Sequence, residues 1–136
     1  MELIKLSNNV TIINDCYNAS YDSMKASLEV LGKMNSERKV AILGDMFELG
    51  DYSEELHKKV GEEVAKNGID VLITVGVLAK IIGAQAERLG VKEVYRFNSN
   101  QECIGEIHEI VKKGDTILLK ASNKMNFGEI SNELTY

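Results

Sequence analysis

Residues 40–76 read VAILGDMFELGDYSEELHKKVGEEVAKNGIDVLITVG and consist of two apolar runs on either side of a charged segment. The two runs, 40–43 and 71–75, are continuous rather than alternating, which is typical of strands in a sheet that is covered on both faces. The charged segment has apolar residues at helical spacing, so we predict a helix over 53–66. Gly68 follows it and suits the left-handed conformation that ends many helices. The stretch therefore predicts two parallel strands joined by a helix.

The same alternation extends over the rest of the chain. Further apolar runs lie at 10–13, 94–97 and 116–119, and helical spacing is found over 24–34, 78–89 and 101–111 and again after Asn126. We expect Asp22 or Ser23 to cap the first helix. The alternating residues 2–6 precede the turn signal Asn8-Asn9, which favours an antiparallel edge strand. Because crossovers between parallel strands are right-handed, the pattern predicts an α/β fold with three layers, built on a Rossmann-like, doubly wound, mostly parallel sheet.

Length and composition place the chain among globular domains. It has 136 residues, of which 44% are hydrophobic and 27% charged, so we expect a single domain over 1–136. The net charge of −5 makes nucleic acid and anionic membranes poor partners, because both attract basic surfaces. No apolar run approaches the ~20 residues of a membrane span, and the first residues lack the apolar centre of a signal peptide. Cys16 and Cys103 form no CxxC motif and fit a reducing, cytoplasmic location.

Polar side chains gather where the predicted strands end. These ends carry Asp15-Cys16-Tyr17-Asn18, Gly44-Asp45-Met46-Phe47-Glu48, Gly76, Asn98-Ser99 and Lys120-Ala121-Ser122-Asn123. Ligands of open parallel sheets bind outside the carboxyl ends of the strands. Loops are polar in general, but acids, a lysine, hydroxyls and amides on one rim together indicate a binding site.

Several common sites are missing from the sequence. It contains no G-x-x-x-x-G-K-[ST] phosphate loop. It also has no G-x-G-x-x-G after the first strand, so no self-contained dinucleotide site is encoded. His57 and His108 have no ligand-like spacing, and we expect structural or surface roles for them and no metal site. Cys16 and Cys103 lie in no nucleophile motif, so we expect packing roles for both and no catalytic residue in this chain.

Four segments resemble the C-terminal domain of the Mur ligases. Residues 10–26, VTIINDCYNASYDSMKA, are similar to the family's D-x-Y-N-A-N-P-D-S-M-x-A-A, and residues 40–50, VAILGDMFELG, are similar to G-D-M-x-E-L-G. Gly68-Ile69-Asp70 and Val75-Gly76 flank the next strand as they do in the family. Residues 118–125, LLKASNKM, are similar to V-K-G-S-R-x-M. The four segments follow the family's order along nearly the whole chain.

The chain departs from the family pattern at three places. Ser20-Tyr21 replaces Asn-Pro, Ala121 replaces Gly, and Asn123 stands where the family usually has Arg. The change at Asn123 removes a guanidinium that could pair with a carboxylate or phosphate.

The resemblance implies a part in ATP-dependent amide-bond formation, in which D-alanyl-D-alanine is added to a UDP-N-acetylmuramoyl-tripeptide during peptidoglycan precursor synthesis. Such ligases have an N-terminal domain for the UDP-sugar, a central P-loop ATPase domain and a Rossmann-like C-terminal domain. The chain matches only the last, which implies that ATP and Mg²⁺ are bound mainly by the central domain. We therefore expect the chain alone to be inactive, with the other two domains, ATP and D-alanyl-D-alanine as its partners.

The resemblance also implies roles for residues of the rim. Asp15, Tyr17 and Asn18 are expected to bind the nucleotide, with the acid and amide on the ribose and the aromatic ring on the base. Asp45 and Glu48 are expected to face the ammonium group of the dipeptide. Lys120, Ser122 and Asn123 are expected to face its carboxylate or a phosphate. Other readings remain open, namely capping or turn formation by Asp15 and Asp45, and an ion pair between Glu48 and Lys120.

Two other classes of protein remain as alternatives. A receiver-like signalling module also places acids at strand ends and a lysine after its last strand, as Asp15, Asp45 and Lys120 stand here, and Asp45 would then be phosphorylated. Against it, Asp45 follows the second apolar run rather than the third, and no proline follows Lys120. A structural interaction domain without a small-molecule ligand is the third possibility.

Overall fold

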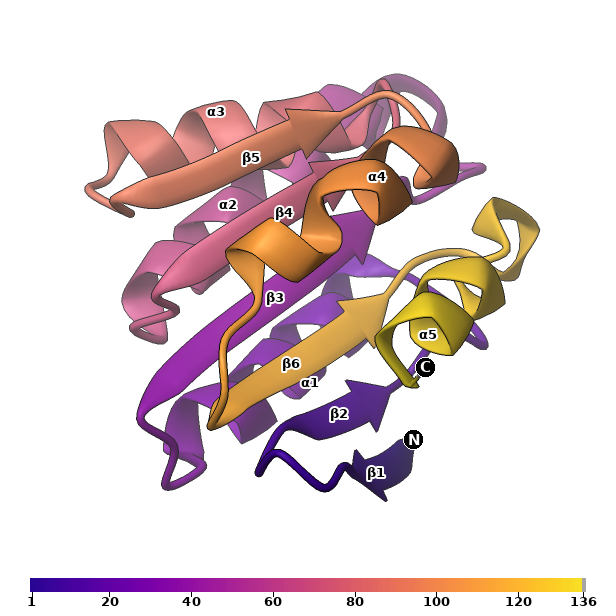
Figure 1. Cartoon of the computed structure of the whole chain (residues 1–136). Helices are drawn as coiled ribbons and strands as arrows, with labels where there is room; N and C mark the ends of the chain where they lie inside the picture. The colour runs from indigo at the N-terminus through magenta and orange to yellow at the C-terminus, as the bar shows by residue number, and fades with distance from the viewer. Residues whose placement is uncertain (136) are drawn as a thin grey trace.

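The computed structural model describes residues 1–135 and shows a single six-stranded sheet between two layers of helices (Figure 1). The strands are β1 (Glu2–Lys5), β2 (Thr11–Asn14), β3 (Arg38–Gly44), β4 (Val71–Val75), β5 (Glu93–Phe97) and β6 (Asp115–Lys120). The helices are α1 (Tyr21–Lys33), α2 (Ser53–Lys66), α3 (Ala79–Arg88), α4 (Asn100–Ile110) and α5 (Gly128–Thr135), with short 3₁₀ turns η1 (Gly50–Tyr52) and η2 (Asn123–Met125). Among residues 1–135, none of the helices is both long and apolar enough to cross a bilayer.

The strand order is β1-β2-β6-β3-β4-β5, and all neighbours are parallel except β1 and β2. Helices α1, α2 and α3 lie on one face of the sheet, and α4 and α5 lie on the other (Figure 1). Right-handed crossovers explain this division, because the chain steps in one direction from β2 to β5 and then returns through α4 to β6. The predicted three-layer, mostly parallel α/β fold is confirmed, as is the antiparallel edge strand, in which Leu3 pairs with Ile13.

Both faces of the central strands are buried, which explains their continuous apolar runs. Along β3, Val40 and Ile42 face the core under α4 and α5, while Ala41 and Leu43 face the core under α1, α2 and α3. All four side chains are fully buried. Burial of one such large aliphatic side chain stabilises a fold by about 1.5–3 kcal/mol. The cores on the two faces therefore hold the sheet in place under the loops at its carboxyl edge.

Helix α2 has the predicted bounds, whereas the start of α1 differs from the prediction. The N-cap of α1 is Ser20, neither Asp22 nor Ser23. The Ser20 hydroxyl accepts a hydrogen bond from the Ser23 amide at 3.2 Å, and the Ser23 hydroxyl accepts one from the Ser20 amide at 2.9 Å. This capping box uses serine where glutamate is usual, which is why the sequence pattern did not reveal it.

Candidate functional site

The return of β6 between β2 and β3 creates a switch point at the carboxyl edge of the sheet. The chain after β2 and after β3 turns to the face of α1 and α2, whereas the chain after β6 turns to the face of α5 (Figure 1). Adjacent loops that diverge in this way leave a crevice, the usual ligand site of open α/β sheets. The loops that meet there are those after Asn14, Gly44 and Lys120.

A buried ion pair lies at the base of this crevice. Lys120 is 2% exposed, and its Nζ donates to Asp15 Oδ2 at 2.8 Å and to the Asn18 carbonyl at 3.0 Å. The Ser27 hydroxyl donates to the same Asp15 oxygen at 2.6 Å. Burial raises the pKa of Asp15, but the hydrogen bonds from Lys120 and Ser27, together with the positive charges of Lys120 and the N-terminus, hold the pKa below its usual value. The pair fixes the loop after β2 against the end of β6.

Two adjoining depressions open above this ion pair. The larger, of about 420 Å³, is lined by Met1, Asp15, Tyr17, Asn18, Ser23, Ala26, Ser27 and Lys120. The smaller, of about 240 Å³, is lined by Tyr17, Asn18, Ala19, Phe47, Glu48, Ser122, Asn123 and Lys124. Tyr17 and Asn18 belong to both, and the Tyr17 side chain is 87% exposed. Every residue predicted for the site, Asp45 excepted, therefore lines one depression or both.

Asp45 lies beneath the rim and turns toward helix α3. The residue is 7% exposed, and its Oδ1 accepts a hydrogen bond from the Ala79 amide at 2.7 Å, at the start of α3. A Cβ atom added to Gly76 would lie 2.5 Å from this oxygen, so only glycine allows the loop to approach so closely. Burial raises the pKa of Asp45, although the hydrogen bonds from the amides of Ala79 and Leu78 lower it in part. Asp45 thus caps α3, one of the readings that the sequence left open.

Glu48 does not pair with Lys120. Its nearest cation is the Lys124 Nζ at 3.8 Å, and the two side chains are 85% and 76% exposed. An exposed pair at this distance contributes little to stability, so both groups remain available to a ligand. The ion pair between Glu48 and Lys120, which the sequence left open as an alternative to ligand contact, is therefore wrong, because Lys120 contacts Asp15 and the Asn18 carbonyl instead.

The loop after β6 lies closely against the end of β3. The Ser122 amide donates to the Asp45 carbonyl at 3.3 Å. A Cβ atom added to Gly44 would lie 2.6 Å from the Ala121 Cβ and 2.8 Å from Phe127 Cζ. Ala121, which replaces the family's glycine, is fully buried and fills the space above Gly44. Ser122 and Asn123 thereby reach the smaller depression.

His57 is a site-supporting residue whose part in the rim was not apparent from the sequence. It is fully buried, its Nε2 accepts from the Met46 amide at 3.1 Å, and its Nδ1 lies 2.7 Å from the Ser53 carbonyl. These two contacts require a neutral ring with the proton on Nδ1. His57 therefore ties the loop after β3 to the start of α2. Its helical spacing from the buried Val60 and Val64 on the same face of α2 was the available signal.

The other residues singled out in the sequence lie away from this site or support its packing. The His108 Nε2 lies 2.7 Å from Glu133 Oε2, an exposed hydrogen bond that joins α4 to α5. Cys103 is buried, and burial raises its thiol pKa to about 12. Burial and the charge of Asp15 raise the pKa of Cys16 to about 11. In residues 1–135, no three histidine, cysteine or acidic side chains form a metal-ligating group.

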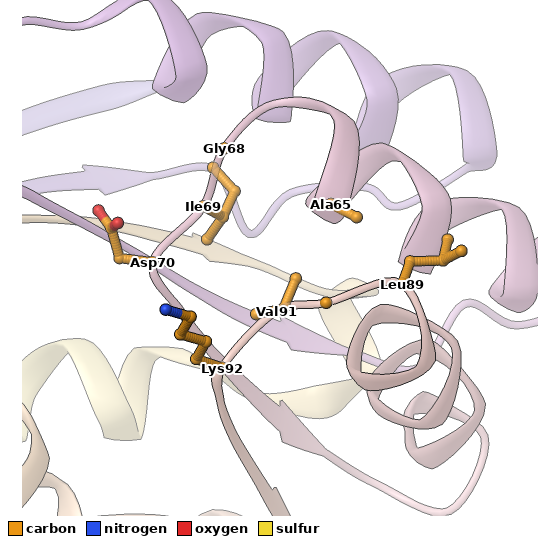
Figure 2. Close-up of a pocket in the computed structure, with 8 residues that line it drawn as sticks. Ala65, Gly68, Ile69, Asp70, Leu89, Val91 and Lys92 are labelled. Carbon is orange, nitrogen blue, oxygen red and sulfur yellow. The ribbon is translucent and has the colours of Figure 1, made fainter.

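A separate depression lies at the opposite edge of the sheet. Figure 2 shows it at the amino ends of β4 and β5, with Asp70 and Lys92 at the left of the view and Leu89 at the right. Its volume is about 350 Å³, and none of the residues predicted for the site lines it. The Asp70 carboxylate accepts a hydrogen bond from the Lys39 amide at 2.8 Å, which gives Asp70 a structural role between β3 and β4.

The strand order contradicts the receiver-like alternative. In receiver-like domains the parallel strands follow the order 2-1-3-4-5, with the last strand at an edge. Here the last strand, β6, lies between β2 and β3. The Asp45 carboxylate accepts a hydrogen bond from the Ala79 amide at the start of α3, whereas Lys120 pairs with Asp15. This arrangement of acids and lysine differs from that of a phosphorylation site.

Comparison with known proteins agrees with this geometry. The family described as "Mur ligase, glutamate ligase domain" matches residues 1–123. The UDP-N-acetylmuramoyl-tripeptide–D-alanyl-D-alanine ligase of Bacillus subtilis (strain 168) is 38% identical over 136 residues, covering 98% of this chain and 30% of that protein. The chain thus spans about a third of the length of the curated relatives that it matches.

Solved structures show the same relationship. MurF from Acinetobacter baumannii superposes with a TM-score of 0.84 at 27% identity, covering 98% of this chain and 30% of that one. MurF ligase from Thermotoga maritima in complex with ADP superposes with a TM-score of 0.80 at 26% identity, covering 98% and 29%. Since the family match, the identity to a curated relative and the overall superposition agree, the chain belongs to the Mur ligase family and corresponds to the glutamate ligase domain of that family.

Proposed function

We propose that this chain is the C-terminal, nucleotide- and substrate-positioning domain of an ATP-dependent ligase that adds D-alanyl-D-alanine to a UDP-N-acetylmuramoyl-tripeptide. The observation that carries the proposal is the pair of adjoining depressions at the switch point, which share Tyr17 and Asn18. A relative that is 38% identical bears that ligase name, and a MurF neighbour in the same fold was solved with ADP. Two neighbouring recesses suit two ligands that must meet.

The larger depression is the proposed nucleotide side. Within residues 1–135, both hydrogen bonds to the Asp15 carboxylate reach Oδ2, so Oδ1 is left to accept from a ribose hydroxyl. The exposed Tyr17 ring offers an apolar face to a base. Asn18 gives its carbonyl to Lys120 and keeps its exposed side-chain amide for the nucleotide. Lys120 then acts chiefly by holding Asp15 and Asn18 in place.

The smaller depression is the proposed dipeptide side. Ser122 and Asn123 can donate to a carboxylate, and the exposed Glu48 carboxylate can accept from an ammonium group. Asp45 lies behind these groups with its Oδ1 already occupied by Ala79. We therefore assign Asp45 to the support of this side, where it fixes the loop that carries Glu48 against α3.

The chemistry follows from bringing the two recesses together. In the proposed reaction ATP transfers its γ-phosphoryl group to a substrate carboxylate, and the dipeptide amine attacks that acyl phosphate, which forms the amide bond and releases phosphate. The chain contains no P-loop, so the ATP phosphates and Mg²⁺ are assigned mainly to the central domain. This domain orients the amine and excludes water when the domains close. Alone it is expected to turn over neither ATP nor peptide.

An NMR titration tests the dipeptide assignment. Amide shifts of this chain are followed with D-alanyl-D-alanine and, as a control, with L-alanyl-L-alanine. We expect selective shifts at 44–50 and 120–125 with the D isomer, while the amides around Asp70 and Lys92 stay unchanged as an internal control. Equal shifts with both isomers contradict the substrate assignment. The titration is repeated with the chain joined to its ATPase domain, and no response there would favour an interaction domain without a small-molecule ligand.

Kinetics of the complete ligase test the nucleotide assignment. Tyr17→Ala removes the exposed ring between the two depressions and is expected to raise the KM for ATP about tenfold, since base–aromatic contacts are worth about 1–3 kcal/mol. Tyr52→Ala is the matched control, because Tyr52 is 68% exposed and lines neither depression. An unchanged KM for ATP in the Tyr17 variant would refute its role.

A further inference from the structure

A single buried amide joins the start of α4 to the loop after β6. Asn100 is 8% exposed although it lies in the first turn of α4. Its Nδ2 donates to the Met125 carbonyl at 2.8 Å, to the Asn126 carbonyl at 3.2 Å and to Glu129 Oε1 at 3.0 Å. These acceptors belong to the end of η2, to the residue after it and to the first turn of α5, and α5 lies beside α4 on the same face of the sheet (Figure 1).

The Met125 carbonyl relies on this external donor. Among the described residues its hydrogen bond comes from Asn100, whereas the Asn126 carbonyl also accepts from the Glu129 amide at 3.1 Å. Asn126 has a left-handed backbone with φ of 56°, which ends η2 and redirects the chain into α5. A backbone carbonyl that packs against a neighbouring helix is costly when it is left unpaired. A short amide side chain supplies two N–H groups at one point, whereas an aspartate of the same shape would place oxygens against the carbonyls of Met125 and Asn126.

The same loop is held at its other end by the site itself. The Ser122 amide donates to the Asp45 carbonyl at 3.3 Å, and the Met125 amide donates to the Ser122 carbonyl at 2.8 Å. Ser122 and Asn123 lie between these anchors and the carbonyls that Asn100 holds. The backbone that carries the two side chains of the smaller depression is therefore held at both ends.

We propose that Asn100 is a positioning residue, which sets the conformation of residues 122–126 and thereby presents Ser122 and Asn123 to the ligand of the smaller depression. Asn100 lines neither depression, so it acts only through this loop. The identity of that ligand rests on the proposed function, whereas the control of the loop by Asn100 does not.

Amide hydrogen exchange on this chain tests the control of the loop. Asn100→Ala and Asn100→Asp are compared with Gln101→Ala, the matched control, because the exposed Gln101 also donates to Glu129, at 3.1 Å to Oε2. We expect exchange at 122–126 to rise about tenfold in both Asn100 variants, the effect of losing one buried hydrogen bond, and to stay unchanged in Gln101→Ala. Unchanged exchange in Asn100→Ala, with the amides of β3 and β4 still protected, overturns the proposal. Asn100→Ser retains one short donor, and its amide exchange is measured instead if the other variants do not fold.

Steady-state kinetics of the complete ligase test the consequence at the site. In Asn100→Ala we expect the KM for D-alanyl-D-alanine to rise about tenfold while the KM for ATP stays the same, because the loop lines only the smaller depression. Faster exchange with an unchanged KM would leave Asn100 a structural residue and overturn its link to the ligand. A wild-type ligase without dipeptide-dependent activity would refute the proposed function, while the exchange result would still decide the role of Asn100 in the loop.

Discussion

Replacement of Asp15 by asparagine tests the buried ion pair at the base of the site. Lys120 is 2% exposed, and its Nζ has Asp15 Oδ2 at 2.8 Å and the Asn18 carbonyl at 3.0 Å as partners. Asparagine keeps the shape and an accepting oxygen but removes the negative charge. The ammonium group of Lys120 is then left buried with only neutral partners, which is the costly way to break a buried pair.

The size of the effect follows from the burial of the two side chains. Removal of one partner from a buried pair costs about 3–5 kcal/mol. Because Asp15 is 16% exposed and solvent screens it in part, we expect the lower end, about 3 kcal/mol. For a chain of 136 residues, an unfolding entropy of about 2.1 cal/mol/K per residue converts this cost into a fall in Tm of about 10 °C.

Urea unfolding at pH 7 and at lower pH measures this cost. The pKa of Asp15 lies below its usual value of 3.8 in the folded chain, so the pair stabilises fully above that value. Its contribution is lost as the pH falls through the folded pKa, and the difference between wild type and Asp15→Asn should shrink there. The double variant Asp15→Asn/Lys120→Met is the control and should recover most of the loss. A cost at pH 7 under about 1 kcal/mol would refute the reasoning.

Three further predictions concern packing, capping and thiol reactivity. Gly44→Ala should destabilise the chain by about 1–3 kcal/mol, because the new Cβ meets Ala121 at 2.6 Å, and Ala121→Gly in the same chain should recover part of this loss in urea unfolding. Ser20→Ala removes the capping box with Ser23 and should cost about 1 kcal/mol in the same assay, whereas full stability would contradict the capping role. The pKa of the Cys16 thiol is raised to about 11, so at pH 8 it should react with iodoacetamide at least about 100-fold more slowly than a free thiol. Mass spectrometry can follow this reaction. A rate near that of free cysteine would show that the thiol is not buried as described.

Much of the fold could be predicted from the sequence because its signals are local. The strand Val71–Val75 and the helix Ser53–Lys66 could be predicted with their bounds. A continuous apolar run reflects a strand buried on both faces, and helical spacing reflects a helix buried on one face. The antiparallel strand Glu2–Lys5 followed from its alternation and the turn after it. The cap of α1 was misplaced by a few residues, because a serine at the third helical position can complete a capping box as glutamate does.

The candidate site was predictable as a group of residues and much less as a set of contacts. Strand ends and family motifs brought Asp15, Asn18 and Ser122 to one rim, and the depressions there include all of them. The partner of Lys120 was not predictable, because residues 15 and 120 are distant in sequence and become neighbours only when β6 enters between β2 and β3. Asn100 gave no signal at all, since a single asparagine at a helix start is common on exposed surfaces.

By itself, the sequence determined the secondary structure, the layered α/β class and the family of this chain, because periodicity and motifs depend on residues that are close in the chain. Only the tertiary structure decided which charges pair and which stay free. Lys120 became a buried partner of Asp15, Asp45 became a cap for α3, and Glu48 remained exposed to a ligand. The physical reason is that burial and distance set the strength of an interaction between charges, and both are properties of the packed sheet and its loops.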